Sequence, residues 1–222
     1  MKSEELYQEY VMSYSELVQY LLVKYGPSEC DYFKDERCSK INHGAIRTLH
    51  GLYCHHIDED KGINLSEPSF AKLQPFEYQK KERLIYCNLL EHLVLHIKIA
   101  ILRERKLKQK HVSADAGVKF ICRTLNDIYA FGGGLKESEK RCAAMVSENV
   151  EDYFRIIAIF LGYMEIQHDF LGEKLIDEME AMVRVLSSGK TNINFYPGIY
   201  KKLCNYELSK EDKNIIRALS KK

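Results

Sequence analysis

Residues 84–108 constrain the fold more than any other part of the chain, because strand, cap and helix signals follow one another there. The apolar start of this segment favours a strand, and Asn88 directly after it is a good N-cap for a helix. Apolar residues then recur at helical spacing to about Lys108. His92 and His96 are four residues apart and therefore share one face of the predicted helix.

A second histidine pair lies upstream. Residues 49–57 are predicted as a strand that ends in a polar loop, and His55 and His56 lie near its end. Adjacent strand residues point to opposite sides, so one imidazole can bind a metal ion while the other faces a substrate. With His92 and His96, the pattern offers three imidazole ligands and one free imidazole that can act as a general base. The alternative is that the helical pair serves packing alone.

The connection between the two pairs, residues 58–82, is long for a compact domain, and loops of this length often carry function. It contains Gly62, Pro68 and Pro75, and it begins with three consecutive acids, Asp58, Glu59 and Asp60. These acids either assist a metal ion or are simply solvated.

The rest of the chain is predicted to be helical. An N-terminal helix over residues 3–25 ends at Gly26-Pro27, and helical patterns resume after a cap at Ser113. Later helices are expected from about Glu137, from about Asn149 and over 175–186, with a break at Gly132–Gly134 and one or two short helices from Thr191. We therefore expect an α+β, mostly helical fold in three parts: an N-terminal helix (1–29), the histidine-bearing core (30–110) and a helical C-terminal region (111–222).

Net charge limits how this chain can meet a nucleic acid. A formal charge of +1 excludes a uniformly basic surface, so a phosphate-binding surface must be a local patch. Basic residues gather at the end of the histidine helix, and we expect phosphate contacts from Arg47, Lys98, Arg103, Arg105 and Lys106. The alternative is a solvated helix end that the helix dipole favours. Acidic residues dominate the later helices, which are expected to form a homodimer or bind a protein partner instead.

Cysteine spacing and hydropathy indicate the compartment. The seven cysteines are scattered and include no Cys-x-x-Cys pair, and the N-terminus does not resemble a signal peptide. Neither a zinc knuckle nor a disulfide framework is expected. The longest strongly apolar run, 156–163, is much shorter than the roughly 20 residues of a membrane span. We expect a cytoplasmic protein without membrane contact.

Two segments, in this order, resemble the phage-type HNH endonuclease family: residues 51–57 (GLYCHHI) and 82–96 (ERLIYCNLLEHLVLH). In that family a strand ending His-His-Ile precedes a helix with Glu-His-x-x-x-His, and the fold is a ββα-metal hairpin plus helix. The resemblance covers about residues 44–105. It implies a metal-dependent endonuclease that hydrolyses DNA phosphodiester bonds, in a phage, mobile-element or bacterial defence setting.

The resemblance also implies roles for the histidines. His55 and His92 would be metal ligands, His56 the general base, and His96 a third ligand or a phosphate contact. The cofactor would be one divalent ion, Mg, Mn, Ni or Zn. A set rich in imidazole favours the transition metals, since Mg²⁺ prefers oxygen ligands.

One position departs from the family pattern. The family asparagine that braces the loop of the general base falls on Arg83. Arg83 is expected to contact the scissile phosphate, unless the hairpin is braced from within residues 58–82. Asn88 aligns with the family's helix-capping threonine, so we favour a cap over a catalytic role for it.

Two functions from different classes stay open. The first is an endonuclease, favoured by the presence of all four histidines. The second is a non-catalytic nucleic-acid- or protein-binding module that keeps an HNH-like, metal-stabilised fold, favoured by Arg83 in place of asparagine. RNA is not excluded as a substrate, because no sequence feature addresses the 2′-hydroxyl.

Overall fold

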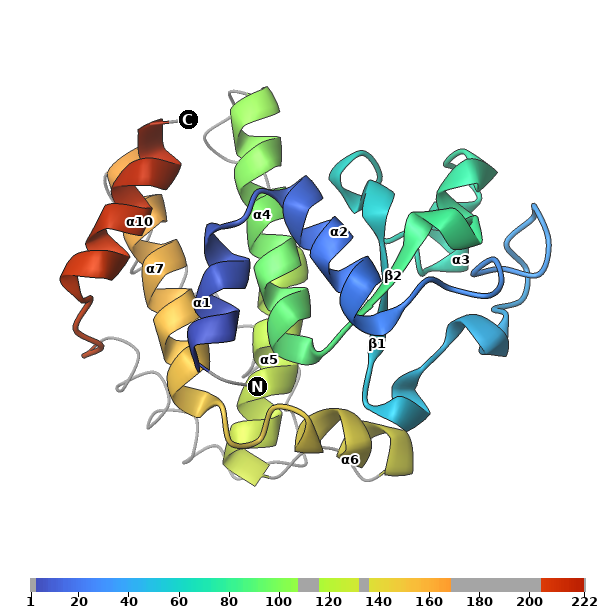
Figure 1. The fold of residues 1–222 in the computed structure, drawn as a ribbon. Coiled ribbons are helices and arrows are strands. Elements are labelled where there is room, and N and C mark those ends of the chain that lie inside the picture. The colour runs from blue at the N-terminus through green and yellow to red at the C-terminus, as the bar shows by residue number, and fades with distance from the viewer. Residues whose placement is uncertain (1–2, 108–115, 132–135, 169–204, 222) are drawn as a thin grey trace, which may run out of the picture.

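The computed structural model describes residues 3–107, 116–131, 136–168 and 205–221 (Figure 1). Helices dominate this part of the chain and its one sheet is a hairpin, which confirms the mostly helical α+β class. The helices are α1 (Ser3–Val11), α2 (Tyr14–Tyr25), α3 (Pro68–Ala71), α4 (Leu89–Leu107), α5 (Ala116–Phe131), α6 (Glu137–Ala144), α7 (Val150–His168) and α10 (Lys210–Lys221), and the strands are β1 (Tyr53–His56) and β2 (Leu84–Cys87).

The predicted N-terminal helix is two helices. The chain breaks after α1, and Ser13 caps α2 by accepting a hydrogen bond from the Glu16 backbone N–H at 3.3 Å. The Glu16 carboxylate accepts in return from the Ser13 N–H at 2.7 Å, which completes a capping box. The spacing Ser-x-x-Glu was therefore the signal for the break. Gly26, at φ 77°, ends α2 where Gly26-Pro27 predicted it.

The two strands form an antiparallel hairpin in which His55 lies opposite Ile85 and His56 opposite Leu84. Strand β1 is shorter than the predicted 49–57, because one-turn 3-10 helices precede and follow it. The following one, η3, spans Ile57–Asp60. The long connection from Asp58 to Glu82 is likewise not an open loop, since it contains α3 and further 3-10 turns.

Helix α4 begins as predicted. The Asn88 side-chain oxygen accepts hydrogen bonds from the backbone N–H groups of Leu90 at 2.9 Å and Glu91 at 3.0 Å. The Glu91 carboxylate accepts from the Asn88 N–H at 2.6 Å. Asn88 is buried and capping occupies its oxygen, so the structure assigns it the helix cap that the sequence favoured.

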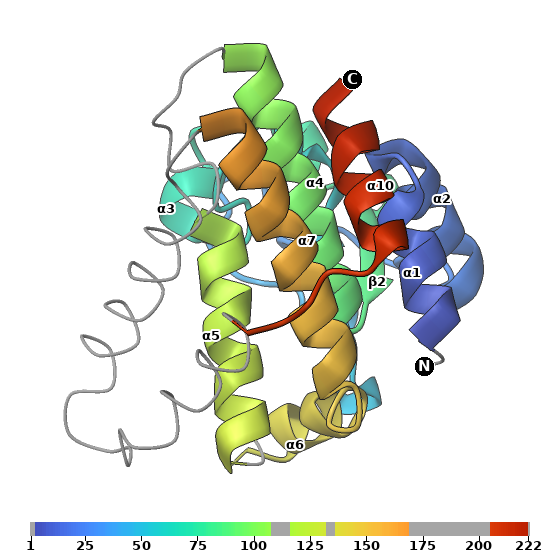
Figure 2. The same ribbon diagram turned by 90° about the vertical axis from the view of Figure 1, so that its left-hand side faces the viewer.

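One hydrophobic core joins the elements around α4. In Figure 1, α4 runs behind α1 and α2, with the hairpin to one side and α7 and α10 to the other; Figure 2 shows α5 and α7 beside it. Buried residues of this core come from α1, α2, β2, α4, α5, α7 and α10. The three predicted parts of the chain therefore share a core. The predicted cap at Ser113, the break at Gly132–Gly134, the helix over 175–186 and the start of the tail at Thr191 lie outside the described residues.

A buried ionic cluster ties the N-terminal helices to α4. The Lys24 ammonium of α2 contacts carboxylates of Glu5 at 2.6 Å, Glu9 at 3.1 Å and Glu91 at 2.7 Å. Glu9 is fully buried, and one of its oxygens has no hydrogen-bond partner. Burial, together with the nearby Glu91 charge, raises the pKa of Glu9 to about 7 despite Lys24. This cluster positions the start of the helix that carries His92.

The state of the cysteines and the apolar character of the helices can also be read from the structure. All six cysteines in the described part of the chain are free. Within the same residues, no helix combines the length and the apolar character that crossing a bilayer requires.

Candidate metal centre

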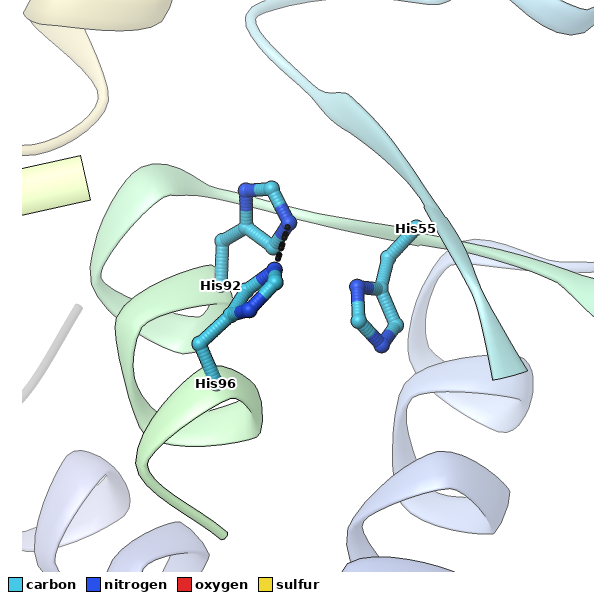
Figure 3. A group of neighbouring side chains, drawn as sticks. All are labelled: His55, His92 and His96. Carbon is cyan, nitrogen blue, oxygen red and sulfur yellow. Dashed lines mark hydrogen bonds between the residues drawn. The ribbon is translucent and has the colours of Figure 1, made fainter. Parts of the chain in front are cut away.

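Three of the four predicted histidines come together. His55 extends from β1, while His92 and His96 extend from successive turns of α4 toward it (Figure 3). One ring nitrogen from each lies within 4.8 Å of the others, and the Nε2 atoms of His92 and His96 are 3.1 Å apart. The hairpin and the helix thus place three imidazoles around one point, as the i, i+4 spacing and the strand position predicted.

Burial favours the uncharged form of His55 and His92. His55 is 1% exposed, and loss of solvation lowers its pKa to about 3, with the neighbouring His96 and His56 acting in the same direction against Glu59. The pKa of His92 is also far below its ordinary value, chiefly through burial. Neutral rings present lone pairs, which is the form that binds a metal ion.

Tyr14 at the start of α2 fixes the tautomer of His55. The Tyr14 hydroxyl donates its single proton to the Ile57 carbonyl at 2.8 Å and also lies 3.1 Å from His55 Nε2. The Nε2–H must therefore be the donor in the second contact, which leaves the lone pair of a neutral His55 on Nδ1. Nδ1 is the buried atom of His55 without a hydrogen-bond partner. Tyr14 thus acts on the centre by orienting a ligand.

A carboxylate completes the cluster. Glu59 lies on η3, immediately after β1, and its Oε2 is 3.1 Å from His96 Nε2 and 3.6 Å from His55 Nδ1. Burial alone would raise the pKa of Glu59, but the contacts with neighbouring histidines, chiefly the hydrogen bond to His96, outweigh it and hold the pKa well below its ordinary value. Glu59, whose side chain is 14% exposed, is therefore an ionised carboxylate beside the histidines.

The residues fit a metal ion. Three imidazole nitrogens lie within 4.8 Å of one another, and a buried His55 nitrogen has no other partner. Nitrogen-rich sets of this kind suit Zn²⁺, Ni²⁺ and related ions better than Mg²⁺. His55, His92 and His96 would hold the ion.

His56 lies apart from this cluster. Its ring is 1% exposed, and its Nε2–H donates to the Gln79 side-chain oxygen at 2.9 Å. The orientation of Gln79 is set because its amide nitrogen donates to the Leu65 carbonyl at 3.1 Å. Tyr32 packs edge-on against the ring at a centroid distance of 4.5 Å. The connection between the strands therefore encloses the side chain to which the resemblance gives the role of general base.

Arg83 makes an internal ion pair. Its guanidinium donates to both carboxylate oxygens of Asp58, through Nε at 2.5 Å and through a terminal nitrogen at 2.6 Å. Lys61 adds a contact to the same carboxylate at 2.6 Å. Asp58 is 1% exposed, so it is not one of the solvated acids that the sequence allowed. Arg83 thus joins the end of the connection to its beginning, the bracing arrangement weighed against a phosphate contact.

Two of the five basic residues assigned to phosphates also hold η3. Arg103 donates to the backbone carbonyls of Glu59 and, at 2.9 Å, Gly62. Lys106 pairs with Asp60 at 3.2 Å. In the described structure, both side chains therefore position the segment that carries Glu59.

The other three basic residues hold more distant elements. The prediction for Lys98 needs correction, because this residue is 6% exposed and its ammonium donates to the Tyr10 carbonyl at 2.7 Å and to the Met12 carbonyl. Arg105 donates to the carbonyl of Leu219 in α10 at 2.6 Å. Arg47 donates to the carbonyls of Tyr25 at 2.9 Å and Pro27 at 3.3 Å, and lies 4.0 Å from the Tyr86 ring centroid. DNA contact by Arg47 and Arg105 stays a prediction.

Two further residues line the centre. Tyr53 of β1 stacks on His92 at a centroid distance of 5.9 Å. Gly117 of α5 lies so close to His96 that an added Cβ would be 2.1 Å from the ring Nδ1. Helix α5 therefore covers one side of the cluster, and a glycine is what allows this approach.

Sequence reasoning missed Tyr14, Gln79 and Gly117 and left Glu59 open. Their roles depend on contacts between distant segments, for which no local pattern exists. For Glu59 a weak signal was present, because it follows His55 by four residues at the end of a strand.

Comparisons of this chain with protein families, with curated proteins and with solved structures give no match. Its function must therefore be argued from the centre itself.

Proposed function

We propose that this protein is a metal-dependent endonuclease of the HNH type, with a divalent transition-metal ion bound by His55, His92 and His96. The observation that carries the proposal is the convergence of one strand histidine and two helix histidines within 4.8 Å, on a hairpin followed by a helix. That order of elements is the one the resemblance implies. A bound ion would supply charge stabilisation for the phosphate undergoing hydrolysis.

The chain's own residues would prepare this centre. Tyr14 orients His55, burial favours the neutral form of His55 and His92, and Arg83 with Asp58 secures the segment after the strand. His56, the proposed general base, donates to Gln79 and faces a packed interior in the described conformation. Burial lowers the pKa of His56, so the ring is neutral and able to accept a proton when solvent reaches it.

A plasmid-nicking assay tests the proposal. Wild-type protein supplied with Mn²⁺, Ni²⁺, Co²⁺ or Zn²⁺ is expected to nick supercoiled DNA, and His92→Ala to lose this activity by at least about 100-fold. His43→Ala is the matched control, since His43 is exposed and lies on the 3-10 turn before the hairpin. His56→Ala tests the base assignment: cutting equal to that of wild type would remove His56 from the mechanism.

A second candidate function is a binding module stabilised by the same metal. Burial of His56 and internal pairing of Arg83, Arg103 and Lys106 favour it, because these groups are then unavailable to a substrate in the described conformation. Absence of nicking with every divalent ion, for a protein shown to bind one ion, would select this candidate.

A further inference from the structure

We propose that Glu59 is a fourth protein ligand, so that the centre has three histidines and one glutamate and selects a transition-metal ion. This inference rests on the proposed metal centre, and it adds a ligand that the resemblance does not imply.

Two hydrogen-bond acceptors, His55 Nδ1 and Glu59 Oε2, face one another. Because Tyr14 receives the Nε2–H of His55, the neutral ring has its lone pair on Nδ1. This atom faces Glu59 Oε2 at 3.6 Å, inside the protein. The His55 atom is buried and the Glu59 side chain is 14% exposed, and two acceptors at that distance repel one another unless a cation lies between them.

His96 Nε2 contacts two neighbours but carries at most one hydrogen. Its Nε2 is 3.1 Å from His92 Nε2 and also 3.1 Å from Glu59 Oε2. A ring nitrogen carries at most one hydrogen, so it cannot donate fully to both neighbours. A cation at the common centre satisfies these lone pairs together.

The spacing of the four side chains and the charge of Glu59 also suit a bound divalent ion. Tetrahedral bonds of about 2.0–2.2 Å separate neighbouring ligand atoms by roughly 3.4 Å. Three of the six pairwise distances, His92–His96 at 3.1 Å, His96–Glu59 at 3.1 Å and Glu59–His55 at 3.6 Å, bracket this value, and the three histidine nitrogens lie within 4.8 Å of one another. In addition, one carboxylate halves the net charge of a buried divalent ion that neutral imidazoles would leave at two.

The segment that carries Glu59 is held in place by cationic side chains. Arg83 and Lys61 fix Asp58 on one side of it, Lys106 fixes Asp60 on the other, and Arg103 binds the Glu59 carbonyl. Cationic side chains thus secure η3 on both sides of one residue. Such support is typical of ligands whose position matters.

The test uses Co²⁺ titration of the metal-free full-length protein, followed by its visible d–d absorption. Wild type is expected to bind one Co²⁺ with the intense absorption of four-coordination. Glu59→Gln is expected to lose at least about 100-fold in affinity and to change the spectrum. Glu67→Gln is the matched control, because it makes the same substitution at an exposed residue of the same connection, and it should stay within about threefold of wild type.

Circular dichroism of the metal-free variants establishes that each one folds. If Glu59→Gln does not fold, Glu59→Asp provides the test, since it keeps the charge but shortens the reach and should weaken Co²⁺ binding with an altered spectrum.

The outcomes separate this inference from the proposed function. Wild-type affinity and spectrum in the Glu59 variants would overturn it, as would a loss below about tenfold with an unchanged spectrum, which would make Glu59 an outer-shell acceptor or a partner of protonated His55. A wild type that binds no Co²⁺ would overturn both. Glu59-dependent binding without DNA cleavage would support the inference and refute the nuclease.

Discussion

Replacing Arg83 by alanine distinguishes a brace from a phosphate contact. The change removes two charge-assisted hydrogen bonds from Asp58, a carboxylate that is 1% exposed, and leaves it with Lys61 alone. Leaving a buried charge without its main partner costs about 3–5 kcal/mol. The Arg83 side chain is 34% exposed and Lys61 remains, so we expect roughly 2 kcal/mol of lost stability.

The assay is urea unfolding of Arg83→Ala, Asp58→Ala and the double variant. Side chains that form one pair should show a coupling free energy of about 1–2 kcal/mol, with the double variant less destabilised than the sum of the single ones. Lys61→Ala is the control, because Lys61 contacts the same carboxylate but is 50% exposed, and it should cost less than about 0.5 kcal/mol.

Coupling below about 0.5 kcal/mol would refute the brace. If Arg83→Ala then kept full stability and lost DNA cleavage, the phosphate contact expected from the sequence would be the correct role.

Three other perturbations address the centre and the core beneath it. Gly117→Ala should lower Co²⁺ affinity at least about tenfold, although alanine is the better helix former by roughly 1 kcal/mol, because its Cβ would displace the His96 ring; unchanged affinity would show that the ring has room. Saturating Zn²⁺ should raise the melting temperature, with about 2.7 kcal/mol of stabilisation at 100 times Kd, and His92→Ala should abolish this shift; an equal shift in the variant would place the ion elsewhere. The pKa of Glu9 in the folded state is about 7, above its reference value of 4.5, so the folded state binds a proton that the unfolded state releases. The free energy of unfolding should therefore fall by up to about 3 kcal/mol as the pH rises from about 4.5 to 7. Glu9→Gln should flatten this pH profile, and a profile identical to that of wild type would contradict the assignment.

Local signals predicted the parts of the fold that depend on local physics. The cap at Asn88 and the start of α4 follow from one side chain and the helical period, and both are confirmed. A strand-end pair and an i, i+4 pair predicted three converging imidazoles, and the family resemblance pointed to His55 as the strand ligand. The sequence suggested Ser15 as a cap for the second part of the N-terminal helix, and the structure places the cap and its capping box two residues earlier, at Ser13.

Long-range contacts decided what local signals could not. Glu59 reads as one of three acids in a loop, and only the folded chain shows it against His55 and His96. The basic run at the end of α4 carries the positive charge that binds phosphates. In the folded chain, however, Lys98 and Arg103 donate hydrogen bonds to backbone carbonyls of distant segments. Charge in a sequence predicts attraction to an anion or a dipole and does not say which one the fold supplies.

The shared core around α4 has a consequence for any attempt to transplant this centre. The apolar face of α4, including Leu93 and Ile97, is covered by helices from both ends of the chain, and Arg105 is tied to the carbonyl of Leu219. A fragment limited to residues 44–105 would carry every histidine of the centre and expose this face to water. Residues 44–105 therefore cannot be moved to another protein as an independent unit. A host protein would have to supply apolar surfaces in place of α1, α5 and α7.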